Sequence, residues 1–229
     1  MAHRWTIAFD ADDTLWHNER FFKLSQKKFA DLLSDYVEPD HLHDRLLAAE
    51  RKNIAFYGFG IKGFTLSMIE TALEVTEGRV SQHVIQQLLD NGREMLRHPI
   101  ELLEGVGETI PRLAADYDLL VITKGDLLDQ ERKVAQSGLG DHFSAVEIVS
   151  DKTAEVYQRI FARHDTARVM MVGNSLKSDV IPAIEAGAWG VYVPHELTWE
   201  YEKADEPDHA RFCKIRSLND LPDLIAKLG

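Results

Sequence analysis

Near the start of the chain, a run of apolar residues gives way abruptly to polar ones. The short apolar run Ile7–Phe9 ends abruptly in three carboxylates, Asp10, Asp12 and Asp13. Runs of this kind, apolar at every position, predict strands that are buried on both faces, as in parallel sheets. We therefore expect a buried strand at 7–9 that ends in an acidic loop.

Residues 19–98 show a different pattern, in which apolar residues recur three and four positions apart and indicate helices. Four helices are expected, at 19–34, 39–54, 64–75 and 80–96. The glycine-rich break 57–63 separates the second helix from the third, and Gly78 marks the expected end of the third. The apolar stripes predict a compact helical unit with its own core.

From residue 99 onward, apolar runs alternate with helical patterns. Strands are expected at 119–122, 145–149, 169–172 and 190–193, with an edge strand at 212–215, and helices at 107–115, 126–136, 153–163, 177–186 and 218–228. This alternation predicts a parallel sheet with helices on both faces. Because the first strand precedes the helical unit, we expect a doubly wound, Rossmann-like α/β core (1–18 and 99–229) with an inserted four-helix cap (19–98).

Composition limits the partners. The 229 residues contain 26 Lys and Arg against 38 Asp and Glu, a net charge of −12, which disfavours nucleic acid and anionic membranes. Residues 1–16 contain no long apolar run, and no stretch approaches membrane-spanning length. The single cysteine, Cys213, fits a reducing cytosol, so we expect a cytoplasmic protein. Its side chain is better explained as a packed apolar group than as a nucleophile. The oligomeric state of the protein stays open.

Polar residues follow four of the expected strands: the acids at 10–13, Thr123-Lys124-Gly125-Asp126, Lys152, and the loop 173–179. In open α/β sheets, chemistry takes place beyond the carboxyl ends of the strands. A hydroxyl, a flexible glycine and a helix N-terminus suit phosphate oxygens. Taken singly, Lys152 is explained as a solvated lysine and Thr123 as a turn residue, but all four together indicate an active site.

The acidic loop Asp10-Ala11-Asp12-Asp13-Thr14 resembles motif I (DxDx[TV]) of the haloacid dehalogenase superfamily. The other three strand ends match the superfamily pattern in order, and 19–98 resembles its inserted helical cap. The resemblance implies that Asp10 attacks phosphorus and becomes a phospho-aspartate, an ability that aspartate has in other enzymes. It implies that Asp12 protonates the leaving oxygen and later activates water, that Thr123, with Lys124, binds the phosphoryl group, and that Lys152 neutralises charge.

The resemblance also implies Mg²⁺, and three acids in four positions independently call for a cation to offset their repulsion. Expected ligands are the Asp10 carboxylate, the Asp12 main-chain carbonyl and a residue of the fourth loop. Asn174 stands where an Asp is usual; its amide oxygen can bind Mg²⁺ but carries no charge. Whether Asn174 or Asp179 is the direct ligand is therefore open. Asp13 replaces a frequent Gly, a mild change because Asp tolerates left-handed backbone.

Within the superfamily, dehalogenases and phosphonate hydrolases lack the second Asp of motif I, and dehalogenases work without a metal. Asp12 therefore favours a Mg²⁺-dependent phosphatase acting on a small phosphorylated metabolite. A phosphomutase needs the same residues and remains an alternative. A catalytically idle phosphate-binding relative is a further alternative. The presence of five candidate site residues argues against it: Asp10, Asp12, Thr123, Lys152 and Asp179.

Substrate choice is expected to belong to the helical unit. The break 57–63 carries three glycines, three large apolar side chains and one cation, Lys62, which is a candidate for contact with the leaving group. The alternative, an interhelical turn with Lys62 in solvent, stays open. His17 is expected to be structural or solvent-facing, and the loop holding His195 and Trp199 is assigned no role.

Overall fold

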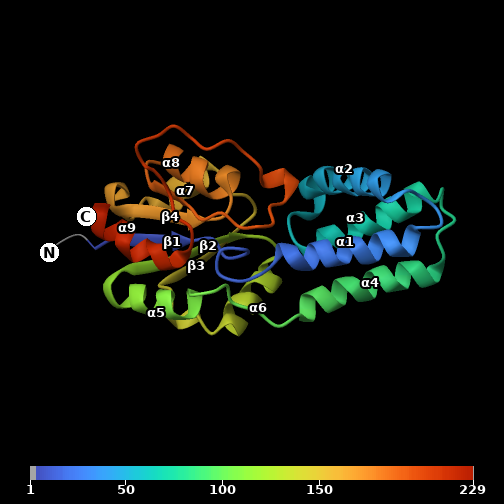
Figure 1. Cartoon of the computed structure of the whole chain (residues 1–229), viewed down its shortest axis with the longest axis horizontal. Coiled ribbons are helices and arrows are strands. Elements are labelled where there is room, and N and C mark those ends of the chain that lie inside the picture. Colours follow the sequence, from blue (N-terminus) through green and yellow to red (C-terminus); the bar gives the residue numbers. More distant parts are fainter. Residues whose placement is uncertain (1–3, 229) are drawn as a thin grey trace. The chain divides into compact units, whose positions relative to one another are not determined.

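The computed structural model describes residues 4–228 and contains a six-stranded, wholly parallel sheet and a separate group of four helices (Figure 1). The chain divides into two compact units. The α/β unit comprises the chain up to Glu19, Ile100–Lys124 and the chain from Gln130 onward. The helical unit comprises Arg20–Pro99 together with Gly125–Asp129.

The sheet has the strand order β3-β2-β1-β4-β5-β6. Its strands are β1 (Thr6–Phe9), β2 (Asp118–Lys124), β3 (Ala145–Val149), β4 (Val169–Gly173), β5 (Trp189–Tyr192) and β6 (Phe212–Lys214). All four residues of β1 are buried because the strand lies in the middle of the sheet with helices on both faces. The doubly wound fold and the edge position of the last strand are as predicted. Because β2 runs on to Lys124, Thr123 and Lys124 are strand residues and not part of a loop.

Two apolar cores cover the two faces of the sheet. The helices of this unit are α5 (Val106–Asp116), α6 (Leu127–Ser137), α7 (Ala154–Phe161), α8 (Ile181–Glu185) and α9 (Leu221–Leu228). Ile7 and Phe9 face the core that α5 and α9 complete, whereas Ala8 faces the core that α7 and α8 complete. Figure 1 shows α7 and α8 on one side of the sheet and α5 on the other. The apolar run therefore alternates between two buried faces, which explains why it lacks polar positions.

The helix expected at 177–186 is divided in two, which corrects the prediction. Leu176–Val180 forms a π-helical turn, and α8 begins only at Ile181. Pro182 has no N–H with which to bond the carbonyl of Ser178, four residues earlier. The hydroxyl of Tyr157 donates to that carbonyl instead, at 3.0 Å. π turns of this kind are frequent at functional sites.

The helical unit contains α1 (Glu19–Leu33), α2 (Pro39–Tyr57), α3 (Ile61–Val75) and α4 (Gln82–Arg97). Its four helices enclose a core of their own, as predicted. The third helix begins three residues before the expected Phe64, because Gly60, at a φ of +112°, caps it and accepts the Phe64 N–H at 3.1 Å. Lys62 therefore lies in the first turn of α3 and not in a loop. No helix within residues 4–228 is long and apolar enough to cross a membrane.

The chain leaves and re-enters the α/β unit at neighbouring points. The N–H of His17 donates to the carbonyl of Glu101 at 3.0 Å, and the N–H of Leu103 donates to the carbonyl of Leu15 at 3.0 Å. Between these bonds, Trp16 and Leu102 form an antiparallel bridge. The two connections to the helical segment are thus held together within the α/β unit itself.

Candidate active site

The polar strand ends meet where β1, β2 and β4 lie side by side. Asp10 extends the ladder between β1 and β4, because its N–H donates to the carbonyl of Val172 at 2.9 Å. Thr123 is the last residue but one of the neighbouring strand and lies two residues beyond Val121, the partner of Phe9 in the β1–β2 pairing. Asp10 and Thr123 are both buried. Adjacent parallel strands thus bring these residues to one edge of the sheet.

Lys152 joins two buried carboxylates. Its Nζ donates to Oδ1 of Asp10 and, at 2.7 Å, to Oδ1 of Asp179. Burial raises the pKa of Asp10 to about 7; Lys152 opposes this rise and Asp179 adds to it. Burial alone would lower the pKa of Lys152, but its two carboxylate partners outweigh burial and raise that pKa above its usual value. The cluster therefore carries one cation against two acidic groups.

Oxygen atoms converge on the other side of Asp10. One end of the Asn174 side-chain amide lies 3.2 Å from Oδ2 of Asp10 and 3.3 Å from the main-chain oxygen of Asp12. If that end is the nitrogen, it donates to both oxygens. If it is the oxygen, it faces two other oxygens, and a cation between them would offset their repulsion. Neighbouring ligands of an octahedral Mg²⁺ bound at about 2.1 Å lie about 3 Å apart, which fits these separations.

This oxygen set consists of one carboxylate, one amide and one main-chain carbonyl. Thr14 adjoins it, with Oγ1 donating to Oδ2 of Asp10 at 3.1 Å and accepting the Asn174 N–H at 3.1 Å. Within the described part of the chain, no group of three or more His, Cys, Asp and Glu side chains is placed to hold a metal ion. A metal here would therefore have one carboxylate ligand and two neutral oxygen ligands, which Mg²⁺ accepts together with water.

Asp179 is fully engaged by the protein. Oδ1 accepts from Lys152, and Oδ2 accepts the Ser175 N–H at 2.9 Å. A Cβ at Gly173 would come within 2.2 Å of Oδ2 of Asp179, so the glycine makes room for this carboxylate. The π turn that carries Asp179 brings it to Lys152, and the oxygen set described above includes Asn174 instead.

Asp12 faces helix α6. Its carboxylate accepts from Nε1 of Trp16 at 2.7 Å, from Nε2 of Gln130 at 2.9 Å and from Nζ of Lys133 at 2.9 and 3.0 Å. Burial raises the pKa of Asp12, but the nearby Lys133 ammonium and these hydrogen bonds outweigh burial, so the pKa lies below its usual value. Gln130 and Lys133 were not predicted from the sequence. Their spacing of three in the helix after Thr123, which puts both on one face, is the signal that could have indicated them.

A second ion pair lies beside the cluster. Lys124 donates to Glu202 and, at 2.7 Å, to Oγ of Ser178, and Glu202 also accepts from Ser175 and Ser178. Burial raises the pKa of Glu202, but Lys124 and the serine hydroxyls outweigh burial and lower it. Glu202 was not predicted, because it lies in a polar loop after β5 that matches no motif. It ties this loop to the strand end at Lys124 and to the π turn.

Asp13 has a structural role. It adopts the left-handed backbone with φ of +59°, and its two carboxylate oxygens accept the N–H groups of Asn18 and Glu19, each at 2.8 Å. Burial raises its pKa to about 6, against the lowering effect of these hydrogen bonds and of His195. The rings of His17 and His195 lie edge to face, with centroids 6.1 Å apart. Asp13 thus closes the turn that leads into α1.

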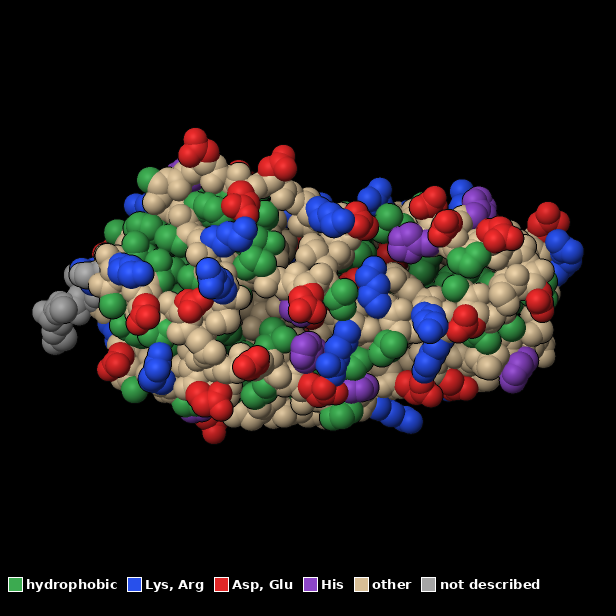
Figure 2. Space-filling view, viewed as in Figure 1, with side chains coloured by type: hydrophobic (Ala, Val, Ile, Leu, Met, Phe, Trp, Pro, Cys, Tyr) green, Lys and Arg blue, Asp and Glu red, His purple; other side chains and the backbone are tan. Residues whose placement is uncertain are grey.

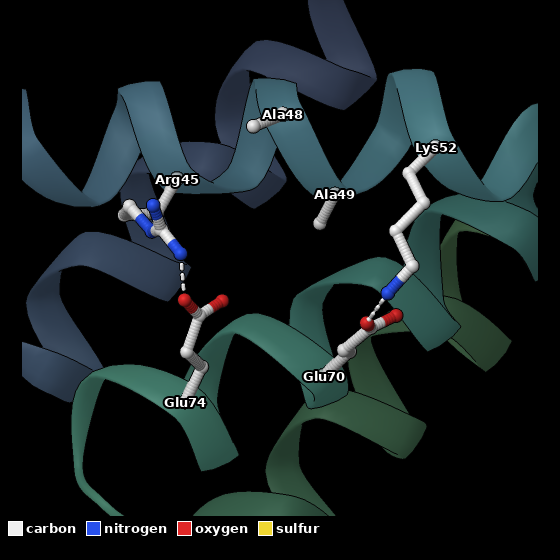
Figure 3. Close-up of a pocket in the computed structure, with 6 residues that line it drawn as sticks. All are labelled: Arg45, Ala48, Ala49, Lys52, Glu70 and Glu74. Carbon is white, nitrogen blue, oxygen red and sulfur yellow. Dashed lines mark hydrogen bonds and ion pairs between the residues drawn. The ribbon is translucent and has the colours of Figure 1, made fainter.

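Lys62 has a carboxylate partner within the helical unit. Its Nζ lies 2.8 and 2.9 Å from the two carboxylate oxygens of Asp126, and about half of its side chain is exposed. A separate groove lies between α2 and α3, where the ion pairs Arg45–Glu74 and Lys52–Glu70 flank Ala48 and Ala49 (Figure 3). This groove contains none of the predicted site residues.

The surface in Figure 2 carries interspersed acidic and basic side chains, with no continuous basic field on the face shown. Electrostatic binding of a polyanion depends on clustered Lys and Arg. Cys213 is half-buried in β6, and burial raises the pKa of its thiol, which disfavours the reactive thiolate. Neither feature adds a second chemical site.

Known proteins resemble this chain in sequence and in fold. The family model of the haloacid dehalogenase-like hydrolases matches residues 6–187. A haloacid dehalogenase-like family hydrolase from Xanthomonas campestris is 39% identical, with a TM-score of 0.89 over 98% of this chain and 91% of that one.

Two curated relatives are more distant. The glyceraldehyde 3-phosphate phosphatase of Methanothermobacter thermautotrophicus is 25% identical over 84% of this chain and 86% of its own length. The pyrimidine 5'-nucleotidase YjjG of Escherichia coli is 24% identical over 82% and 84%. The match of the family model over most of the chain identifies the protein as a hydrolase of the haloacid dehalogenase-like family.

Proposed function

We propose that this hydrolase is a Mg²⁺-dependent phosphatase that hydrolyses a small phosphorylated metabolite through a phospho-aspartate on Asp10. The observation that carries the proposal is the environment of Asp10: one carboxylate oxygen contacts Lys152 and the other faces Asn174 and Thr14. A nucleophile for phosphoryl transfer needs this combination of a nearby cation and a fixed orientation. The names of the two curated relatives, both phosphatases of small phosphate esters, support it.

In the first step, a carboxylate oxygen of Asp10 attacks phosphorus and the bond from phosphorus to the leaving oxygen breaks. Asp12 gives its proton to that oxygen, so the alcohol leaves neutral and Asp12 becomes a carboxylate. Lys152 stabilises the charge on Asp10 and on the transferring group. Thr123, buried at the end of β2, donates its hydroxyl to a phosphoryl oxygen.

In the second step, water gives a proton to Asp12 and its oxygen attacks phosphorus. The bond between phosphorus and Asp10 breaks, which restores the Asp10 carboxylate and releases inorganic phosphate. Asp12 ends with the proton that the next turnover needs, so the cycle closes with one ester and one water consumed. A phosphomutase would use the same residues but would have to keep water from the phospho-aspartate.

The residues beside Asp10 fit Mg²⁺. Oδ2 of Asp10, the main-chain oxygen of Asp12 and the amide oxygen of Asn174 would hold it, since one end of the Asn174 amide lies 3.2 Å from the first oxygen and 3.3 Å from the second. Asp179, also a candidate ligand from the sequence, has both oxygens engaged by Lys152 and Ser175, which favours Asn174 as the direct ligand. When bound, Mg²⁺ would neutralise charge on the phosphoryl oxygens and fix their orientation.

Residues 19–98 are proposed to act as the cap that selects the leaving group. Lys62 and Lys124 are the candidate cations for substrate binding, although each is paired with a carboxylate, Asp126 and Glu202 respectively. A substrate anion would have to compete with these partners or bind beside them. The two relatives differ in substrate by name, so the identity of the metabolite follows from neither.

Phosphate release from p-nitrophenyl phosphate and from a panel of phosphorylated sugars, nucleotides and hydroxy acids tests the proposal. We expect turnover that requires Mg²⁺ and stops on addition of EDTA. Phosphate release without metal, or transfer of phosphate between positions of one substrate without release, would contradict it. Absence of turnover on the whole panel, together with binding of inorganic phosphate, would favour the idle phosphate-binding relative.

A further inference from the structure

We infer that Lys133 and Gln130, two residues of α6, are positioning residues that fix the carboxylate of Asp12 for proton transfer to the leaving group. This inference rests on the proposed phosphatase function, in which Asp12 is the general acid. Both residues donate to the carboxylate of Asp12 and are proposed to act through it, so neither is proposed as a catalytic residue.

The geometry around Asp12 restrains its carboxylate on both sides. Nζ of Lys133 lies 2.9 Å from Oδ1 and 3.0 Å from Oδ2, so it bridges the two oxygens. Trp16 donates to Oδ1 at 2.7 Å, and Gln130 donates to Oδ2 at 2.9 Å. Donors at both oxygens fix the plane of the carboxylate, which is what a group that must transfer a proton along a defined direction requires.

The donors themselves are well anchored. Gln130 and Lys133 are 2% and 6% exposed, and Trp16 is 1% exposed. Lys133 also donates to Oδ1 of Asn18 at 3.0 Å. A lysine held in one conformation loses side-chain entropy, and this loss costs free energy. Ion pairs between a lysine and a carboxylate at the surface contribute too little stability to offset such a cost. The burial of Lys133 against the side chain of a proposed acid is therefore better explained by a role in positioning that acid.

Gln130 provides a second, independent observation. Among the residues that the structure describes, its amide oxygen Oε1 is buried without a hydrogen-bond partner, whereas its amide nitrogen donates to Asp12. A buried acceptor left unpaired costs free energy. During turnover, Asp12 carries a proton and one of its oxygens becomes a donor. Turned end for end, the Gln130 amide would accept that proton with Oε1, so it can support Asp12 in both states.

The experiment compares two substrates that differ in their need for an acid. p-Nitrophenolate leaves without a proton, whereas the alkoxide of an alkyl phosphate such as glycerol phosphate does not. kcat/KM reports the steps up to the transfer to Asp10 and excludes hydrolysis of the phospho-aspartate. We expect Lys133→Met to lower kcat/KM for the alkyl phosphate roughly tenfold to a hundredfold more than for the aryl phosphate, a fraction of what general acid catalysis supplies.

Matched variants separate positioning from folding. Gln130→Met removes the amide without changing charge and should shift the same ratio in the same direction by a smaller factor, which keeps the test available if Lys133→Met does not fold. Lys133→Arg retains a cation and should restore part of the ratio. Lys203→Met removes a lysine from an exposed pair with Glu200 and should leave the ratio unchanged.

Equal losses on both substrates in a folded Lys133→Met protein, or no loss, would overturn the inference while leaving the phosphatase proposal intact. A gain on the alkyl phosphate would also overturn it, since Lys133 would then restrain Asp12 away from its working position. A wild-type protein that hydrolyses neither substrate would overturn the proposed function, and the inference with it.

Discussion

Nζ of Lys152 lies 2.7 Å from Oδ1 of Asp179, and both side chains are almost completely buried. Lys152 also contacts Asp10. Lys152→Met would leave two buried carboxylates without a cation, and removal of one partner of a buried ion pair costs about 3–5 kcal/mol. We therefore expect a loss of about that size in the free energy of unfolding, measured by urea denaturation, together with loss of activity.

The double variant Asp10→Asn, Lys152→Met serves as the control for this first prediction. Asn at position 10 removes one of the two stranded charges, so part of the lost stability should return while activity stays absent. A Lys152→Met protein as stable as the wild type would contradict the prediction, because it would mean that both carboxylates are already neutralised in some other way.

Asp10→Asn alone should abolish turnover and leave the fold intact. The change removes the attacking charge and conserves volume. Since burial disfavours the Asp10 carboxylate, as its raised pKa indicates, the variant should be at least as stable as the wild type. Steady-state phosphatase assays beside circular dichroism and thermal unfolding measure both effects. Activity near the wild-type level in the folded variant would remove Asp10 from the mechanism.

Asn174→Asp should tighten Mg²⁺ binding, because a charged oxygen would replace the neutral amide beside Oδ2 of Asp10. The measurement is the concentration of Mg²⁺ that gives half-maximal activity, with the Mg²⁺-dependent rise in melting temperature as a second readout that needs no turnover. Asp179→Asn is the comparison. It should weaken the contact with Lys152 and change the Mg²⁺ concentration for half-maximal activity less than a change at position 174 does. An unchanged response to Mg²⁺ in Asn174→Asp would exclude Asn174 from the metal ligands.

We expect the contribution of Glu202 to the free energy of unfolding to depend on pH. Its pKa in the folded protein lies below the usual 4.5, so its ionised form stabilises the fold above that pH, and this contribution is lost as the pH falls through the lower folded pKa. Glu202→Gln should cost about 1.5–3 kcal/mol at pH 7, the range for hydrogen bonds to a charged group. The difference from wild type should stay constant down to about pH 5.5 and narrow below it. A difference that grows on acidification would contradict this assignment.

Lys62→Ala should have two separable effects. Because the Lys62–Asp126 pair is partly exposed to solvent, its loss should change the free energy of unfolding by only about 0–1 kcal/mol. If Lys62 holds the leaving group, kcat/KM for the preferred metabolite should fall roughly tenfold to a hundredfold, as for one charge-assisted hydrogen bond, and that for acetyl phosphate much less. Equal losses on both substrates would remove Lys62 from leaving-group binding.

Much of the fold could be predicted from the sequence, because its signals are local. The apolar run at 7–9 and the helical spacing in 19–98 each depend on neighbouring residues, and the structure confirms the elements they predict. The early start of α3 was missed because Gly63 was taken for a loop residue. It lies inside the helix, where a Cβ would come within 2.9 Å of the carbonyl of Gly58.

The partners of the site residues could not be predicted, because they depend on contacts distant in the sequence. Asp10 and Lys152 were expected at one site from the order of the strand ends, and they meet across 142 positions. Lys133 and Glu202 belong to no motif and approach the site only through the packing of α6 and of the loop after β5. Pattern and motif therefore indicate the candidate residues at the strand ends, whereas the residues that contact them are found only in the structure.

The main-chain hydrogen bond between His17 and Glu101 has a consequence for the evolution of the inserted segment. The segments that leave and re-enter the α/β unit are hydrogen-bonded to each other at this point. Any insert between them therefore starts and ends at two positions that are already held close together. We therefore expect that segments of other lengths can be inserted between these two residues without a change in the sheet. To exchange the insert for that of a relative, the two junctions should be placed directly after His17 and directly before Glu101.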